Sequence, residues 1–207
     1  MLNFSPIRPA TPADAPYFYE ICLKTSLAGA DGSDYFQDPY MTGAYWSAPY
    51  LWHDMDLCFI AEDFSGRPAG YIVGTKDTTT YNQWLAQEWL PTIQKQYATV
   101  RAASEPEKTI LSLIRKGNPG AGVWENVGYP AHLHINILPS LQGRGIGRRL
   151  MENWLGKAEE KHLQGVHFGV DARNKSAIGF YGHLGFTVLE NTDHSLIFGM
   201  KLPRGEK

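Results

Sequence analysis

Two histidines separated by one residue, His132 and His134, are suited by type and spacing to proton transfer. Neutral imidazole can take a proton from an ammonium group because its ordinary pKa lies close to 7. The run H-L-H-I-N-I alternates polar with apolar residues, which is the period-two pattern of a β-strand with two differently used faces. We therefore expect both histidines and Asn136 on one face of a strand. A purely structural role, with both rings hydrogen-bonded, stays open for them.

A glycine-rich turn follows this strand. After Pro139 the chain reads S-L-Q-G-R-G-I-G, and the residues beyond it are apolar at helical spacing. The first N–H groups of a helix have no internal partner and lie at the positive end of its dipole. Because glycines let the backbone approach a ligand closely, the turn predicts a phosphate or pyrophosphate site. The buried stripe expected for the helix consists of Ile146, Leu150, Met151, Trp154, Leu155 and Ala158.

Two common nucleotide-binding motifs do not fit this turn. The fingerprint G-x-G-x-x-G would need glycine at Arg148, and G-x-x-x-x-G-K-[ST] would need Lys-Ser or Lys-Thr where Arg148 and Arg149 stand. The segment 142–147 instead matches Q/R-x-x-G-x-G/A, the pyrophosphate loop of the GNAT superfamily of acyl-CoA-dependent N-acetyltransferases. Further along, the segment 174–186 resembles the N-x-x-A-x-x-F-Y-x-x-x-G-F segment of the same superfamily. Two separate motifs thus give the chain its resemblance to GNAT enzymes.

The resemblance implies that acetyl-CoA is the acyl donor. In this superfamily the central strand splays from its neighbour, and the cleft between them admits the pantetheine arm. The backbone of Ile137 and Leu138 would bind the donor's carbonyl and pantetheine amides. Asn174 matches a residue that contacts the cofactor arm, and it would serve equally well as a simple helix N-cap. The implied pyrophosphate site consists of Gln142, Gly143, Arg144, Gly145, Ile146, Gly147 and Arg148.

Acetyl transfer to an amine also needs a base for the amine and a proton for the departing thiolate. Tyr181 matches the family's proton donor to the CoA sulfur, and a tyrosine is protonated at neutral pH, as a general acid must be. His134 is a candidate base, and His132 is a less favoured one, since arylalkylamine-type members also have two alternating histidines on this strand. Asp171 is a competing base or amine-binding carboxylate. No third ligand accompanies the H-x-H pair at a recognisable spacing, so we predict no metal site.

The predicted elements indicate an α/β fold. Strands and helices alternate, which argues for a GNAT-like three-layer α-β-α fold with a mixed central sheet. We expect one acetyltransferase domain over residues 1–207, with a helical insertion between the third and fourth strands at about residues 77–128. Within it, residues 81–97 and 107–116 have apolar residues at helical spacing. The aromatic-rich region 31–52 would pack short helices onto the core or form a wall of the acceptor site.

The composition is that of a globular protein. With 207 residues, of which 43% are hydrophobic and 19% charged, the chain can bury a sizeable core. A formal net charge of -2 offers no bulk attraction to nucleic acid or to an anionic membrane, and we expect neither as a partner. Cys22 and Cys58 form no disulfide or zinc pattern, and no signal peptide or membrane span is recognisable. We expect a cytoplasmic protein. A homodimer is common for the resembled fold, but no residue indicates one.

The segments 84–91 (W-L-A-Q-E-W-L-P) and 129–139 (Y-P-A-H-L-H-I-N-I-L-P) resemble the bacterial acetyltransferases that are similar to the C-terminal domain of eukaryotic O-GlcNAcase. That eukaryotic domain looks like a pseudo-enzyme without the glycine loop, whereas the loop is intact here. Two hypotheses follow. The first is an acetyl-CoA-dependent N-acetyltransferase that acts on a small-molecule or protein amine; the second is an acyl-CoA-binding or protein-interaction module whose chemistry has lapsed. The loop and Tyr181 favour the first.

Overall fold

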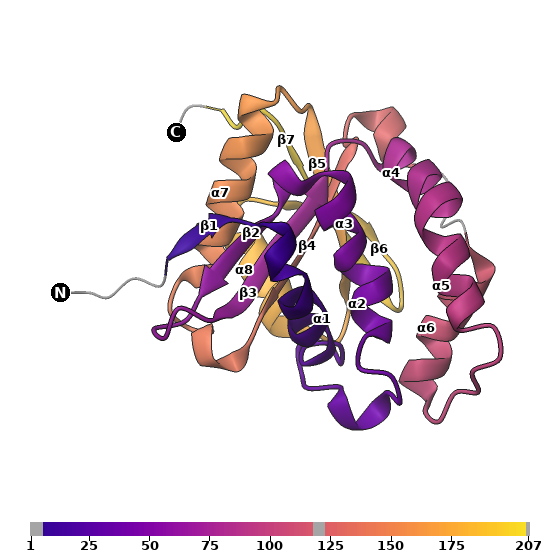
Figure 1. The fold of residues 1–207 in the computed structure, drawn as a ribbon. Helices are drawn as coiled ribbons and strands as arrows, with labels where there is room; N and C mark the ends of the chain where they lie inside the picture. The colour runs from indigo at the N-terminus through magenta and orange to yellow at the C-terminus, as the bar shows by residue number, and fades with distance from the viewer. Residues whose placement is uncertain (1–5, 118–122, 206–207) are drawn as a thin grey trace.

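A seven-stranded mixed sheet forms the centre of the molecule (Figure 1). The computed structural model describes residues 6–117 and 123–205. The strand order is β1-β2-β3-β4-β5-β7-β6, in which β4 and β5 run parallel and the other neighbours run antiparallel. This confirms the predicted mixed sheet. The strands are β1 (Ile7–Pro9), β2 (Phe59–Glu62), β3 (Pro68–Thr75), β4 (Ala131–Ile137), β5 (Gly165–Asp171), β6 (Thr187–Asn191) and β7 (Ser195–Lys201).

Helices cover both faces of the sheet and give the expected three layers. One face carries α1 (Ala15–Leu23), α2 (Met41–Trp46) and α3 (Ala48–His53), and the other carries α7 (Ile146–Glu160) and α8 (Lys175–His183). Alternate residues of β3 show this division. Tyr71 and Val73 belong to an apolar cluster with α1, whereas Ile72 belongs to a second cluster with α7. Because both of its faces are covered, β3 is buried along its whole length.

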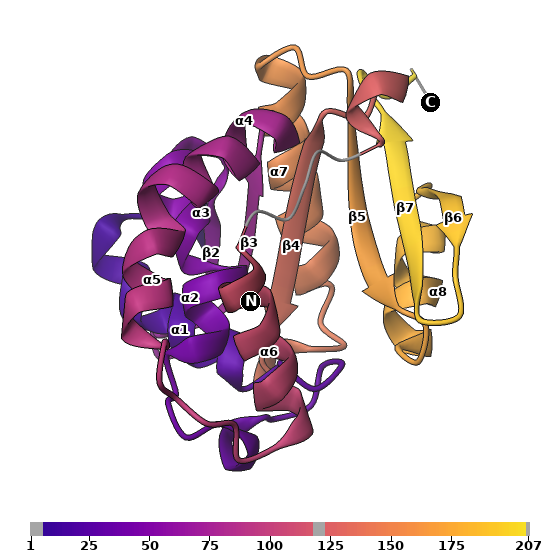
Figure 2. The ribbon, with the colours of Figure 1, turned by 90° about the vertical axis from the view of Figure 1, so that its right-hand side faces the viewer.

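The segment between β3 and β4 is helical, as predicted. It contains α4 (Thr78–Trp84), a π-helical turn (Leu85–Trp89), α5 (Leu90–Gln96) and α6 (Glu105–Lys116). Figure 2 shows α5 and α6 beside α1 and α2, and the buried residues of these helices belong to the same apolar cluster. The buried carboxylate of Glu107 ties α6 to the chain before α2, because it accepts hydrogen bonds from Gln37 N at 2.8 Å and Ala103 N at 2.6 Å. Part of the expected insertion, residues 118–122, lies outside the described residues.

Candidate active site

The sheet opens between its two parallel strands. β4 pairs with β3 from His132 to Ile137, but its pairing with β5 ends after His132 and His167. Figure 2 shows the two strands diverging beyond this point. The second half of β4 is therefore only partly buried, although it lies in the middle of the sheet. The strand predicted to hold the acyl donor thus has an open side that faces β5.

The backbone of β4 determines which groups point into this splay. The N–H of Leu138 donates to Ala69 O at 2.9 Å, and the carbonyl of Leu138 accepts from Leu141 N at 3.0 Å. Hydrogen-bonded pairs alternate in an antiparallel ladder, so the even-numbered residues of β4 bond to β3, while Ile135 and Ile137 direct their N–H and C=O groups toward β5. The N–H of Leu138 is engaged with β3, whereas the backbone of Ile135 faces the open side of the strand, as that of Ile137 does. That Ile137 and Leu138 bind the donor stays a prediction.

Gly143 and Gly145 form the left-handed turn that leads into α7. Their φ angles are +70° and +74°, and a Cβ atom added at either residue would meet no atom within 4 Å. Gly145 is the N-cap of α7, and within the described ranges no side chain caps this helix. Its first amides are therefore left for solvent or for an anion. Gly147 has a different role: a Cβ there would lie 3.1 Å from Phe180 Cζ, so this glycine allows α7 to pack closely against α8.

Exposed cationic side chains surround this loop. The guanidinium of Arg144 lies over the ring of Phe64, 5.3 Å from its centroid, and the side chain of Arg148 is 51% exposed. Gln142 donates from Nε2 to the carbonyl of the last residue of β4 at 2.8 Å, which ties the loop to the strand. The side chain of Ile146 is only 3% exposed, so its amide alone can take part in binding. Two guanidinium groups and a helix N-terminus together suit a pyrophosphate.

Tyr181 lies in α8, on the α7 side of the sheet, and is 7% exposed. Its ring packs against Phe168 and Phe198, with centroid distances of 4.5 Å and 5.7 Å. Burial raises the pKa of Tyr181 above its ordinary value, so the hydroxyl keeps its proton at neutral pH. Asn174 caps α8, because its Oδ1 accepts a hydrogen bond from Ala177 N at 3.0 Å. The N-cap role of Asn174 is thus present, while its contact with a cofactor stays a prediction.

His132 is held by hydrogen bonds at both ring nitrogens. Its Nε2 lies 2.6 Å from the Tyr50 hydroxyl and its Nδ1 lies 2.7 Å from Thr78 Oγ1. The Thr78 hydroxyl donates to the Pro130 carbonyl at 2.8 Å, so Nδ1 of His132 must donate to Thr78 and Nε2 must accept from Tyr50. Burial lowers the pKa of His132 well below its usual range. This arrangement corresponds to the structural role that the sequence had left open.

His134 lies on the same face of β4 but makes different contacts. Its ring centroid is 5.4 Å from that of Trp46 and 5.6 Å from that of Tyr50. Within the described part of the chain, no hydrogen bond engages its ring nitrogens. Burial lowers the pKa of His134 to about 4, so the ring is neutral at pH 7. His134 keeps a free lone pair, although its surroundings oppose the charged form that a base must adopt.

Asp171 ends β5 and is committed to an arginine. Arg173 forms an ion pair with it at 2.6 Å and also donates from its backbone N–H at 2.8 Å. These bonds lower the pKa of Asp171 to about 2. A carboxylate with so low a pKa is a poor base, and it fits better the alternative role of binding a cationic amine. The role of Asp171 stays a prediction.

Sequence reasoning missed two residues of this face. His167 on β5 lies 6.0 Å from His132 between ring centroids, and the period-two pattern of β5 indicates only that it shares a strand face with Asp171. Tyr50 comes from the aromatic-rich region, is 3% exposed and stacks on Tyr81 at 4.5 Å. Tyr50 therefore packs in the core, which was one expectation for the region 31–52, and it also contacts His132, a candidate site residue.

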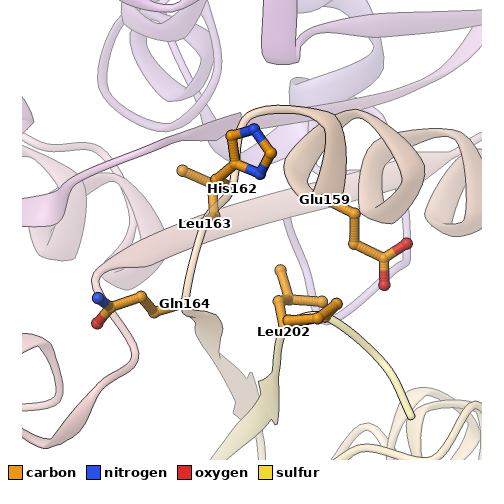
Figure 3. A pocket seen from close by; sticks show the side chains of 6 residues that line it. Glu159, His162, Leu163, Gln164 and Leu202 are labelled. Atoms are coloured by element: carbon orange, nitrogen blue, oxygen red, sulfur yellow. The ribbon is translucent and has the colours of Figure 1, made fainter.

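A separate hollow of about 210 Å³ lies at the far end of α7 (Figure 3). At about 1.5 Å per residue, the length of α7 separates it from the glycine loop by roughly 20 Å. It is therefore no part of the splay. The residues that line it are Glu159, His162, Leu163, Gln164, Leu202 and Pro203.

An uncapped glycine turn at the open end of a splayed strand pair suits the pyrophosphate and the extended arm of an acyl-CoA, as the donor of an acyl-CoA-dependent transferase. Comparison with protein families agrees with this class, because the model described as "Acetyltransferase (GNAT) family" matches residues 30–186. The chain belongs to the GNAT acetyltransferase family. The matched range contains the second half of β4, the glycine loop and Tyr181.

Two curated proteins are similar to this chain over part of their length. The chain is 25% identical to Protein O-GlcNAcase of Rattus norvegicus over 182 residues, which cover 86% of this chain but only 20% of that protein. It is 28% identical to a mycothiol acetyltransferase of Nocardioides sp. over 124 residues, which cover 58% of this chain and 42% of that enzyme. The chain thus spans a minor part of the length of these relatives.

Solved structures show the same fold. The crystal structure of SsHAT is 33% identical, with a TM-score of 0.84, and the match covers 96% of this chain and 98% of that chain. A phosphinothricin acetyltransferase of Sinorhizobium meliloti in complex with AcCoA has a TM-score of 0.59 at 15% identity, covering 96% of this chain and 88% of that one. This second likeness shows the fold alone. Across the described ranges, no helix is long and apolar enough to cross a membrane.

Proposed function

We propose that this protein is an acetyl-CoA-dependent N-acetyltransferase that moves an acetyl group to a primary amine by direct attack. The observation that carries this proposal is the continuity between the splay and the glycine loop: the open side of β4 leads directly to the uncapped start of α7. A donor with a pyrophosphate at one end and an amide-containing arm at the other matches these two features. The likeness to a phosphinothricin acetyltransferase in complex with AcCoA also supports this donor.

The backbone would hold the donor in two places. The N–H and C=O groups of Ile135 and the N–H of Ile137 point away from β3 and would bond the amides of the arm and the thioester carbonyl, while the C=O of Ile137 already accepts from Gln142. The amides from Gly143 to Gly147, together with Arg144 and Arg148, would bind the pyrophosphate. When bound, acetyl-CoA supplies an acyl group activated as a thioester. Binding along these fixed groups would orient that acyl group before reaction.

Side chains would then move the two protons. The buried hydroxyl of Tyr181 holds a proton that it can give to the departing sulfur, because burial keeps this group neutral. His134, neutral and free of hydrogen bonds, is a candidate to take the proton of the amine, and Asp171 is a second candidate that the ion pair with Arg173 weakens. The acceptor would be a small-molecule or protein amine, and we expect the reaction to take place in the cytoplasm.

Calorimetric titration with acetyl-CoA tests this proposal. We expect micromolar binding by the unaltered protein and a loss of about tenfold or more in Gly145→Leu, because a side chain there would occupy the space where the pyrophosphate meets the helix amides. Gly66→Leu is the matched control. Gly66 also has a positive φ, +84°, and open surroundings, so it imposes the same backbone strain outside the loop.

The outcomes separate the two hypotheses. Binding by Gly66→Leu but not by Gly145→Leu would locate the pyrophosphate at the loop. Binding that is unchanged in Gly145→Leu would contradict that location. If the unaltered protein binds acetyl-CoA but transfers no acetyl group to any primary amine in a broad panel, the acyl-CoA-binding module replaces the enzyme. If it binds no acetyl-CoA, the proposed function is wrong.

A further inference from the structure

We infer that His167, rather than His134 or Asp171, is the base that takes the proton of the acceptor amine, a role that rests on the proposed acetyl transfer. Its backbone pairs with His132 in the last rung before β4 and β5 part, so His167 stands at the closed end of the splay. The glycine loop lies at the open end. A pantetheine arm that is anchored at the glycine loop and runs back along Ile137 and Ile135 brings its acyl end toward His167.

Hydrogen bonding defines the tautomer of His167. Its Nδ1 lies 2.8 Å from the carbonyl oxygen of Tyr129. A carbonyl can only accept, so Nδ1 is the donor, and in the neutral ring Nε2 has the lone pair. Among the described residues, no hydrogen bond to Nε2 is present. This nitrogen is free to receive a proton, whereas both nitrogens of His132 are already engaged.

The Tyr129 carbonyl also distinguishes His167 from His134. Both rings are partly buried, and this burial lowers both pKa values. For His167, backbone groups of Tyr129 and Ala131 oppose this effect, because carbonyl oxygens stabilise the charged ring. His134 has no such partner. Other titratable groups on this face include His132 and Asp171, and the latter is paired with an arginine.

The Tyr129 carbonyl, which orients the His167 ring, belongs to a segment that is itself held against β7 and β5. Lys201 of β7 donates from Nζ to the carbonyls of Val127 at 2.7 Å and Gly128 at 3.1 Å, and the same Nζ lies 4.1 Å from the centroid of the Tyr129 ring. A Cβ added at Gly165 would lie 2.5 Å from Gly128 O, so only glycine lets this segment lie against β5. Lys201 is therefore a positioning residue, which acts on His167 through the Tyr129 carbonyl.

The inferred step balances with the role of Tyr181. Nε2 of His167 takes a proton from the acceptor nitrogen as that nitrogen bonds to the acyl carbon. The C–S bond then breaks, its electron pair leaves on sulfur, and the Tyr181 hydroxyl gives its proton to that sulfur. Exchange with water returns a proton to Tyr181 and removes one from His167. No further reactant is required.

Affinity labelling with bromoacetyl-CoA tests this assignment without a known acceptor. The reagent places an electrophilic carbon where the acetyl methyl group would lie, and an unprotonated nitrogen beside it displaces bromide to form an N–C bond. We expect peptide mass mapping of the full-length protein to find the label on His167, acetyl-CoA to suppress it, and His167→Gln to abolish it. His134→Gln should keep the label. His162→Gln, at the far end of α7, is the control for loss of a histidine elsewhere.

A second variant tests the positioning role. Lys201→Met removes the cation while keeping an apolar chain, and we expect slower labelling of His167 with unchanged acetyl-CoA affinity. Label on His134 alone, or no label on any histidine although acetyl-CoA binds, would overturn the assignment and leave the proposed function intact. Absence of acetyl-CoA binding would overturn the proposed function itself, and with it the role of His167.

Discussion

Thr78 joins the helical insertion to the candidate active site through a single hydroxyl. It is the first residue of α4, and its Oγ1 connects Nδ1 of His132 with the Pro130 carbonyl. The substitution Thr78→Val keeps the shape of the side chain and removes only this connection. The backbone N–H of Thr78 continues to donate to Pro130 O at 2.8 Å, so that carbonyl keeps a partner. The variant therefore leaves one buried group unsatisfied, the Nδ1–H of His132.

The expected cost follows from that single group. A buried donor left without a partner costs about 1–3 kcal/mol, a figure that already contains the lost hydrogen bond. We therefore expect Thr78→Val to lower the free energy of unfolding by about 1–3 kcal/mol. In a chain of this length each kcal/mol lowers Tm by about 2–4 °C, so Tm should fall by roughly 2–12 °C. Acetyl-CoA affinity should be unchanged, because Thr78 lies outside the glycine loop.

Urea unfolding measures this cost, with the midpoint and slope compared between variants. Thr109→Val is the matched control. Its exposed hydroxyl bonds only to the carbonyl of Glu105 one turn earlier, so the change should stay within about 0.5 kcal/mol. If Thr78→Val is no less stable than Thr109→Val, His132 does not depend on Thr78, and the assigned direction of its hydrogen bonds is refuted.

Two further predictions concern proton transfer and pH. Tyr181→Phe should lower acetyl transfer by about 10²-fold or more while acetyl-CoA affinity stays within a factor of about two, as measured by thiol release and calorimetry; unchanged turnover would exclude the hydroxyl as the acid. Arg204 lowers the pKa of Glu159 to about 2, from an ordinary value of 4.5, so the ion pair stabilises the folded protein at neutral pH. As pH falls from 4.5 toward 2, the unfolded chain binds more protons than the folded one, and this stabilisation is lost. The Tm of Glu159→Gln, followed from pH 6 to pH 3, should therefore fall less than that of the unaltered protein, and parallel curves would contradict the ion pair.

The glycine loop could be predicted from the sequence because its chemistry is local. Left-handed backbone at Gly143 and Gly145 and a helix that starts without a side-chain cap are properties of a few consecutive residues. Asn174 could be recognised as an N-cap for the same reason. The alternation in β4 likewise placed both histidines on one face. Patterns that repeat within one element are thus readable without knowledge of its neighbours.

The different roles of the histidines could not be predicted from such local patterns. His132 is structural because Tyr50, from a distant helix, and Thr78, from the insertion, engage its two nitrogens. The sequence shows neither contact, since both depend on how the helices pack on the sheet. His167 was missed for a similar reason, because it shares a face with His132 only once β5 is known to be the parallel neighbour of β4.

The choice between Ile135 and Leu138 depends on register. One residue along a strand turns the backbone groups from one neighbour to the other, and the hydrogen bond from Leu138 to Ala69 fixes that parity. The sequence motif locates the end of the strand but not its pairing with β3. The resemblance therefore points to a stretch of chain, while the pairing with β3 decides which of its backbone groups are open toward β5.

The early end of the β4–β5 pairing divides the hydrogen-bond ladder of the sheet into two parts, which are joined through two residue pairs, Ala131 with Val166 and His132 with His167. On one side lie β1 to β4 with the insertion; on the other lie β5, β7 and β6 with α8. Amides of Ile135 and Ile137, which have no strand partner, should exchange with solvent far faster than those of the fully paired β3. An extended ligand bonded to them would act as an additional strand and complete the ladder. Substrate binding would then also join the two parts of the molecule, adding about 2.7 kcal/mol of stability at a ligand concentration of about 100 Kd.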